Sequence, residues 1–199
     1  CGTDTKIYQG KIPANYPLVM GHEIVGEIVS GDTTDDFTVG TRVLVDPVLF
    51  CGDCFHCDRG ETQLCPNGGI MGREVNGGFA DYCVAGTTHT YKLPDEIDGK
   101  TGAAIQVLTT VLHAQDNGGV GDGDTVTVTG LGVTGLMHIQ LAKARGAKRV
   151  IGVSRNAHKR EVALALGADA AVTHGADAKK AVLDATDGVG ADVVIECVG

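Results

Sequence analysis

Four cysteines crowd into one short stretch, Cys51-Gly-Asp-Cys-Phe-His-Cys-Asp-Arg-Gly-Glu-Thr-Gln-Leu-Cys65. In the spacing Cys-x2-Cys-x2-Cys-x7-Cys, thiolates separated by two residues can reach one ion from a single turn of loop. Four thiolates satisfy the tetrahedral preference of zinc and leave no position for a reacting water, so such a site is structural. An iron–sulfur cluster and disulfides are the alternatives. We predict structural zinc on Cys51, Cys54, Cys57 and Cys65.

A second group of metal-binding residue types lies near the start of the chain, in Cys1-Gly-Thr-Asp4 and Gly21-His22-Glu23. Thiolate and imidazole are good zinc ligands, and Glu23 could ligate or hydrogen-bond behind the site. A lone Cys and a lone His are also common in purely structural roles. These residues by themselves therefore leave a metal site and a structural role both open.

A glycine pattern, Gly130-Leu-Gly-Val-Thr-Gly135, directly follows the strand-like run Thr125–Thr129 and opens a helical segment. In this context the first glycine allows a tight turn, the second lets a pyrophosphate approach, and the third lets helix pack on strand. The helix N-terminus then faces the phosphates. We predict a dinucleotide-binding loop formed by Gly130, Gly132, Val133 and Gly135.

The choice of dinucleotide is expected at the end of the next strand. A carboxylate about 20 positions after the glycine loop would bind the ribose hydroxyls and select NAD. Ser154 stands there instead, followed by Arg155 and Lys159. Arg155 can bind a 2′-phosphate through charge-assisted hydrogen bonds, which favours NADP. If Arg155 is only solvated, NAD or both dinucleotides remain possible.

The elements that must position these residues differ between the two halves. Short β-prone runs separated by Gly and Asp clusters predict a small β-rich domain in the first half: 24–29, 42–45 and 79–84. The second half alternates strands and helices, which predicts a parallel sheet flanked by helices. Its expected helices are 101–115, 133–145, 158–166 and 178–185, and its expected strands are 125–129, 149–153, 170–172 and 192–196.

Composition excludes several classes of function. A net charge of −9 with scattered basic residues argues against nucleic acid as a partner. No apolar run approaches the roughly 20 residues of a membrane span. Seven cysteines, an odd number with four in one cluster, fit a reducing cytoplasm better than a secreted disulfide scaffold.

The motifs taken together resemble one family. Cys1-Gly-Thr-Asp4, Gly21–Gly26, the four-cysteine loop, Gly77-Gly-Phe-Ala-Asp-Tyr82 and the glycine loop occur in the order and at the distances of the zinc-dependent medium-chain alcohol and polyol dehydrogenases. This resemblance implies a chaperonin-10-like β-rich catalytic domain over 1–115 and a Rossmann dinucleotide-binding domain over 116–199. It also implies a homo-dimer or homo-tetramer. The family's first strands and the second half of its Rossmann sheet are missing, so we expect a fragment.

Residue roles follow from the resemblance. Cys1 and His22 match the first two ligands of a catalytic zinc, Thr3 matches the hydroxyl that takes the substrate proton, and Asp4 and Glu23 match carboxylates behind the site. The family's third ligand, a Cys or Glu, aligns with Gln106, a weaker neutral oxygen donor. Thr110 matches a position near the nicotinamide. Lys6 stands where many relatives place a proton-relay His, and we interpret it as a solvated lysine.

The expected function is a zinc-dependent dehydrogenase that transfers hydride between an alcohol, polyol or sugar and NADP or NAD. Because Gln106 weakens the ligand set, a zinc-free quinone or enone reductase of the same fold is one alternative. A non-catalytic nucleotide-binding protein with only the structural zinc is the other.

Overall fold

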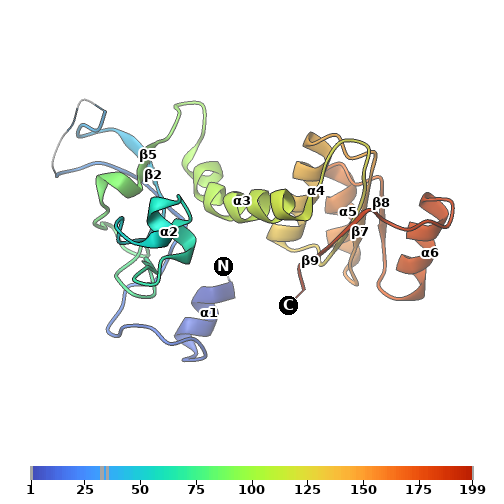
Figure 1. Ribbon diagram of the computed structural model, residues 1–199, viewed down its shortest axis with the longest axis horizontal. Helices are drawn as coiled ribbons and strands as arrows, with labels where there is room; N and C mark the ends of the chain where they lie inside the picture. The colour runs from blue at the N-terminus through green and yellow to red at the C-terminus, as the bar shows by residue number, and fades with distance from the viewer. Residues whose placement is uncertain (1, 32–33, 35, 199) are drawn as a thin grey trace. The chain divides into compact units, whose positions relative to one another are not determined.

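The computed structural model describes residues 2–31, 34 and 36–198. The chain divides into two compact units, Cys1–Gln106 and Val107–Gly199. Helix α3 (Gly99–Gly118) begins in the first unit and ends in the second (Figure 1). It begins where Asp98 accepts hydrogen bonds from the N–H groups of Lys100 and Thr101. The bond from Thr101 N–H is the largest cause that lowers the pKa of the Asp98 carboxyl.

The first unit is β-rich, as the sequence predicts, but its strands are very short. Strands β1, β2 and β5 form an antiparallel sheet in that order, and β3 pairs antiparallel with β4. Burial alternates along β2, which places Val43 and Val45 toward the interior. The elements are α1 (Gly2–Tyr8), β1 (Ile24–Glu27), β2 (Arg42–Val45), β3 (Val48–Leu49), α2 (Phe55–Asp58), η1 (Thr62–Leu64), β4 (Gly69–Ile70), η2 (Thr87–His89) and β5 (Thr90–Lys92).

The second unit is a parallel sheet of strand order β8-β7-β6-β9, and its strands and last three helices lie within two residues of those predicted. The predicted helix 101–115 corresponds to α3, which begins two residues earlier and ends three residues later. Val126 and Val128 of β6 pack with Ile139 and Ala142 of α4 in the core. Successive strand residues face opposite sides of a sheet. Thr127 therefore faces away from α4. The elements are β6 (Thr125–Thr129), α4 (Val133–Ala144), β7 (Arg149–Val153), α5 (Ala157–Ala165), β8 (Ala170–Val172), α6 (Ala176–Ala185) and β9 (Val193–Glu196).

One predicted strand is wrong. The run 79–84 forms no strand, and its side chains Tyr82 and Val84 are exposed. A strand needs a partner for its backbone groups. Phe79 N–H bonds to Met20 O, but the described residues 80–84 that follow pair with no strand. Cys83, expected to be a buried apolar residue, is exposed for the same reason, whereas Cys197 is half-buried.

Within the described ranges, none of the helices combines the length and the apolar character that crossing a membrane requires.

Candidate functional site: a four-thiolate cage, a histidine–carboxylate pair and a glycine loop

The structure brings the four predicted cysteines together. Cys54 immediately precedes α2, and Cys65 directly follows η1. Gly68 lets the chain fold back tightly here, because a Cβ at this position would lie 2.7 Å from Leu49 O and 3.0 Å from Cys65 O. Short turns in the chain therefore bring all four thiols to one place.

The distances between the sulfur atoms fit a single tetrahedral ion. The Sγ atoms of Cys54 and Cys57 are 3.5 Å apart, as are those of Cys51 and Cys65, and two further pairs are 3.9 Å apart. A Zn–S bond of about 2.3 Å in tetrahedral geometry requires sulfur atoms about 3.8 Å apart. A cluster with several irons would spread the thiolates over different metal atoms. The donor set therefore fits structural zinc.

As bare thiols, these cysteines would differ in acidity. A backbone hydrogen bond from Cys57 is the main cause that lowers the pKa of Cys54 to about 7. A hydrogen bond with the Asp53 side chain is the main cause that raises the pKa of Cys51 to about 12. Zinc must displace the remaining thiol protons, so its affinity falls as the pH falls.

His22 and Asp4 form a buried pair in the same unit. His22 Nδ1 lies 3.4 Å from Asp4 Oδ1, and the side chains are 6% and 11% exposed. Metal-binding histidines commonly have a carboxylate behind one ring nitrogen, which fixes the ring and its tautomer. In a pair of this kind the other ring nitrogen, here Nε2, is the one that can ligate an ion.

Close glycine packing positions His22. A Cβ at Gly77 would lie 2.0 Å from Gly21 O, and one at Gly72 would lie 2.8 Å from Gly21 N. Gly77 N–H also bonds to Val19 O, and Gly78 N–H bonds to Gly21 O. Gly21 itself has a φ of +99°, which strongly favours glycine. The glycines of the 77–82 motif thus hold the backbone beside His22.

The other residues predicted for this site come from separate parts of the chain. Thr3 lies on α1 and Gln106 on α3, and both are half-buried, as is Glu23. Cys1 lies outside the described residues. Among those that are described, the four-cysteine cage is the one group of His, Cys, Asp or Glu side chains with metal-binding geometry. Lys6 is exposed, in agreement with a solvated lysine.

The glycine loop connects β6 to α4. Gly130 has a φ of +86°, and a Cβ there would lie 2.8 Å from the carbonyl of Cys197. A Cβ at Gly135 would lie 2.0 Å from Gly130 O, whereas one at Gly132 would meet no protein atom within 4 Å. Gly132 is the N-cap of α4, and Val133 is its first residue. The open space at Gly132, beside unpaired N–H groups of a helix start, is a cradle that fits a pyrophosphate.

The turn from β7 to α5 carries the predicted ribose-binding residues. Arg160 donates a hydrogen bond to Ser154 O over 2.7 Å, and Asn156 caps α5 by accepting from Lys159 N–H. Arg155 and Lys159 are exposed at the same turn. Arg160 therefore braces the turn, and Arg155 and Lys159 are its exposed cations.

Thr110 lies outside this turn, on α3, where its hydroxyl bonds to Val107 O.

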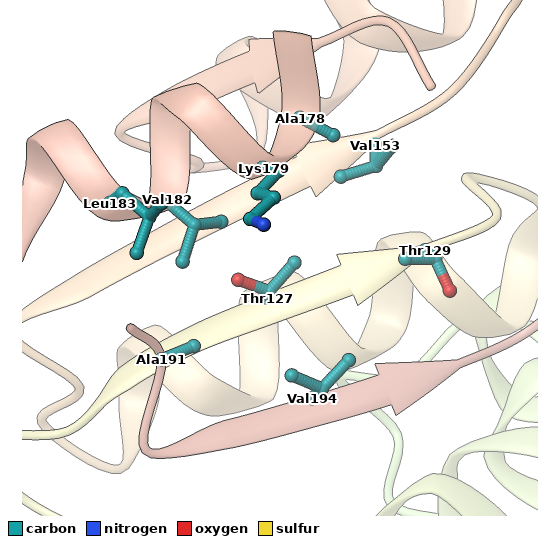
Figure 2. A pocket seen from close by; sticks show the side chains of 9 residues that line it. All are labelled: Thr127, Thr129, Val153, Ala178, Lys179, Val182, Leu183, Ala191 and Val194. Atoms are coloured by element: carbon teal, nitrogen blue, oxygen red, sulfur yellow. The ribbon is translucent and has the colours of Figure 1, made fainter. Parts of the chain in front are cut away.

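A pocket of about 240 Å³ lies between α6 and the sheet face opposite α4. Figure 2 shows Lys179 and Val182 pointing from α6 toward Thr127 of β6. The remaining lining includes Thr129 and Val153, the last residues of β6 and β7. The pocket thus extends to the carboxyl ends of two strands, where α/β sheets bind ligands.

The sequence analysis missed a buried polar pair, Gln115 of α3 and His138 of α4. Gln115 Nε2 lies 2.8 Å from His138 O and 3.2 Å from His138 Nδ1. The two residues are 0% and 3% exposed. They lie 23 positions apart, so no local pattern signals the pair.

This pair predicts a pH-dependent stability. Burial lowers the pKa of His138 below its ordinary value of about 6.5. The unfolded chain then binds a proton more readily than the folded chain. Stability should be complete above about pH 6.5 and should fall as the pH decreases toward the folded pKa.

Thermal unfolding measured from pH 8 to pH 5 checks this expectation. His138→Gln should lose less stability over this range than the unmodified chain does, because a glutamine does not titrate. Equal losses in the two proteins would contradict a role for His138.

Comparison with known proteins agrees with this geometry. The family model described as "Alcohol dehydrogenase GroES-like domain" matches residues 1–95, and that described as "Zinc-binding dehydrogenase" matches residues 133–199. A sorbitol dehydrogenase of Halalkalibacterium halodurans is 37% identical over all of this chain. The chain belongs to the zinc-containing medium-chain alcohol/polyol dehydrogenase family. It spans 59% of the length of the sorbitol dehydrogenase.

Solved structures of related dehydrogenases share the fold. A zinc-binding dehydrogenase from Sinorhizobium meliloti, solved with NADP, superposes with a TM-score of 0.90 at 37% identity, covering 100% of this chain and 59% of its own. The alcohol dehydrogenase RspB of Escherichia coli, solved with NADH, gives 0.90 at 32% identity, covering 100% and 59%. The predicted fold class, a GroES-like β-rich domain followed by a partial Rossmann sheet, is confirmed.

Proposed function

We propose that this chain carries the zinc-binding and nucleotide-binding parts of an NADP-preferring dehydrogenase of alcohols, polyols or sugars. The observation that carries the proposal is the buried pair of Asp4 and His22, because a carboxylate-oriented histidine is what a catalytic zinc ligand requires. When bound, zinc polarises a substrate oxygen and the nicotinamide exchanges hydride with the adjacent carbon.

The residues of the chain hold and orient these groups. In this proposal His22 and Cys1 are two ligands of the catalytic zinc, and Asp4 fixes the ring of His22. The hydroxyl of Thr3, on the helix that also carries Asp4, accepts the proton of the substrate alcohol. Either the amide oxygen of Gln106 or the carboxylate of Glu23 completes the ligand set.

The preference for NADP rests on the β7–α5 turn. No carboxylate stands at Ser154 to repel a 2′-phosphate, and the guanidinium of Arg155 is exposed beside it. One relative of known structure was solved with NADP and another with NADH, so both dinucleotides belong in the test.

The experiment measures zinc per chain together with oxidation of a panel of alcohols, polyols and sugars in the presence of NADP+ or NAD+. We expect two zinc ions per chain and faster reduction of NADP+. His22→Ala should retain one zinc and lose turnover by about a thousandfold, since metal polarisation contributes several kcal/mol to the transition state. His174→Ala, at an exposed histidine, is the control and should change neither quantity.

Other results would support other functions. A single zinc per chain, with turnover of quinones or enones but not alcohols, would favour a zinc-free reductase. Tight dinucleotide binding with no turnover of any substrate would favour a binding protein.

A further inference from the structure

The loop that holds the four-cysteine cage contains a carboxylate that is not a ligand. Glu61 lies in the seven-residue gap between Cys57 and Cys65, the longest gap between ligands. Its Oε2 lies 3.1 Å from His56 Nδ1, and its Oε1 accepts a hydrogen bond from Arg59 Nε over 3.3 Å. The Glu61 side chain thus links His56, which precedes Cys57, to Arg59, which follows it.

Backbone and ring contacts support the same turn. Glu61 N–H bonds to His56 O over 2.9 Å, and Leu64 N–H bonds to Glu61 O over 2.9 Å. The guanidinium carbon of Arg59 lies 5.2 Å from the centroid of the Phe55 ring. Phe55 also packs edge-on against His56. We call His56, Arg59 and Glu61, with the Phe55 ring beneath them, the Glu61 clamp.

Arg59 and Glu61 of the clamp lie in the longest gap between the cage ligands, which is where the loop can open. Two-residue gaps keep Cys51, Cys54 and Cys57 close along the chain, but the seven residues before Cys65 can open further. Loss of the ion begins when one thiolate detaches, and the detached thiolate either returns or moves away. A restrained turn between Cys57 and Cys65 favours its return.

We propose that Glu61 is a positioning residue for the metal cage, and that by binding His56 and Arg59 together it keeps Cys65 beside the other three thiolates and slows release of zinc. This role concerns retention of the structural ion and does not depend on the proposed dehydrogenase activity. It uses neither ligation by His56 nor a change of ligand set.

The test is the rate at which the zinc-loaded protein releases its structural ion to a chromophoric chelator. The relevant kinetic phase is the one that disappears in Cys57→Ser. Glu61→Gln should accelerate it about three- to tenfold, as expected when a partly exposed hydrogen bond to His56 and a partly exposed ion pair with Arg59 are weakened together. Asp58→Asn is the matched control, since it removes the same charge from the same loop at an exposed side chain. The control should leave the rate unchanged.

A second readout separates positioning from ligation. With Co2+ in place of zinc, the thiolate-to-metal absorption should be identical in Glu61→Gln and the unmodified protein, because the four ligands are the same. His56→Ala combined with Glu61→Gln should release zinc no faster than the faster single variant, because the two residues share one contact.

The proposal is overturned if Glu61→Gln releases zinc at the unmodified rate. It is also overturned if Asp58→Asn accelerates release equally, which would indicate a general charge effect. If Glu61→Gln fails to fold, Arg59→Gln, which keeps the contact between His56 and Glu61, should still accelerate release, and an unchanged rate would contradict the clamp.

Discussion

Alanine at Gly135 is expected to destabilise the second unit by about 3 kcal/mol or more, whereas alanine at Gly132 should leave it folded and weaken dinucleotide binding at least about tenfold. The new Cβ at Gly135 would lie 2.0 Å from Gly130 O, a backbone atom that cannot move without shifting the loop. The Cβ at Gly132 meets no protein atom within 4 Å, and the φ of −83° suits any residue. It would instead occupy the cradle where the pyrophosphate approaches.

Thermal unfolding and calorimetric titration with NADPH and NADH separate the two effects. Gly132→Ala should cost at most about 1 kcal/mol of stability, because alanine is a poorer N-cap than glycine. Unmodified dinucleotide affinity in Gly132→Ala would mean that the pyrophosphate does not lie against this residue. Unmodified stability in Gly135→Ala would contradict the tight contact with Gly130.

Cys57→Ser is expected to remove one zinc per chain and to lower the free energy of unfolding of the first unit by about 4 kcal/mol or more. Four of the Sγ–Sγ distances are 3.5–3.9 Å and all four sulfur atoms lie within 4.8 Å of one another, so the loop 51–65 closes around one ion. Its ordered elements are short, since α2 has four residues and η1 three. A loop with so little regular structure depends on the ion for its order.

Elemental analysis and thermal unfolding, with and without a strong chelator, check this expectation. Cys83→Ser is the matched control, because Cys83 is an exposed thiol outside the cage. It should retain the zinc content and unfolding temperature of the unmodified protein. A Cys57→Ser variant with unchanged zinc content would show that the remaining three thiols suffice, and the cage would not be a closed four-thiolate site.

The parallel sheet was predictable because its signals are local. Runs such as Thr125–Thr129 and Arg149–Val153 are β-prone for five residues and end at turn residues. The first unit gives weaker signals. Its strands Val48–Leu49 and Gly69–Ile70 are too short to show alternation, and each exists because the other pairs with it. The run 79–84 shows the converse, since β-propensity without a partner forms no strand.

Part of the candidate site was likewise predictable from local sequence, and part was not. Spacing alone indicated the cysteine cage, and strand context indicated the glycine loop. Asp4 and His22 are 18 positions apart, and only the family resemblance predicts that the Asp4 carboxylate lies behind the site. Gln115 with His138 depends on how helices pack, and Glu61 with His56 on how a loop turns, so neither pair has a sequence signature. The roles of Cys1, Thr3, Glu23 and Gln106, and the assignment of domains to 1–115 and 116–199, stay proposals.

The strand order of the parallel sheet has a consequence for how the protein is made. β6 lies between β7 and β9, and Thr125 and Asp192, which meet at the start of β6 and β9, are 67 positions apart. At a synthesis rate of about 5–20 residues per second, the ribosome needs about 3–13 s to produce the intervening chain. Until β9 pairs with it, β6 presents an unpaired edge that carries Val126 and Val128, which are fully buried in the folded structure. The growing chain therefore passes through a stage in which this open edge can pair with another chain, and slow translation prolongs that stage.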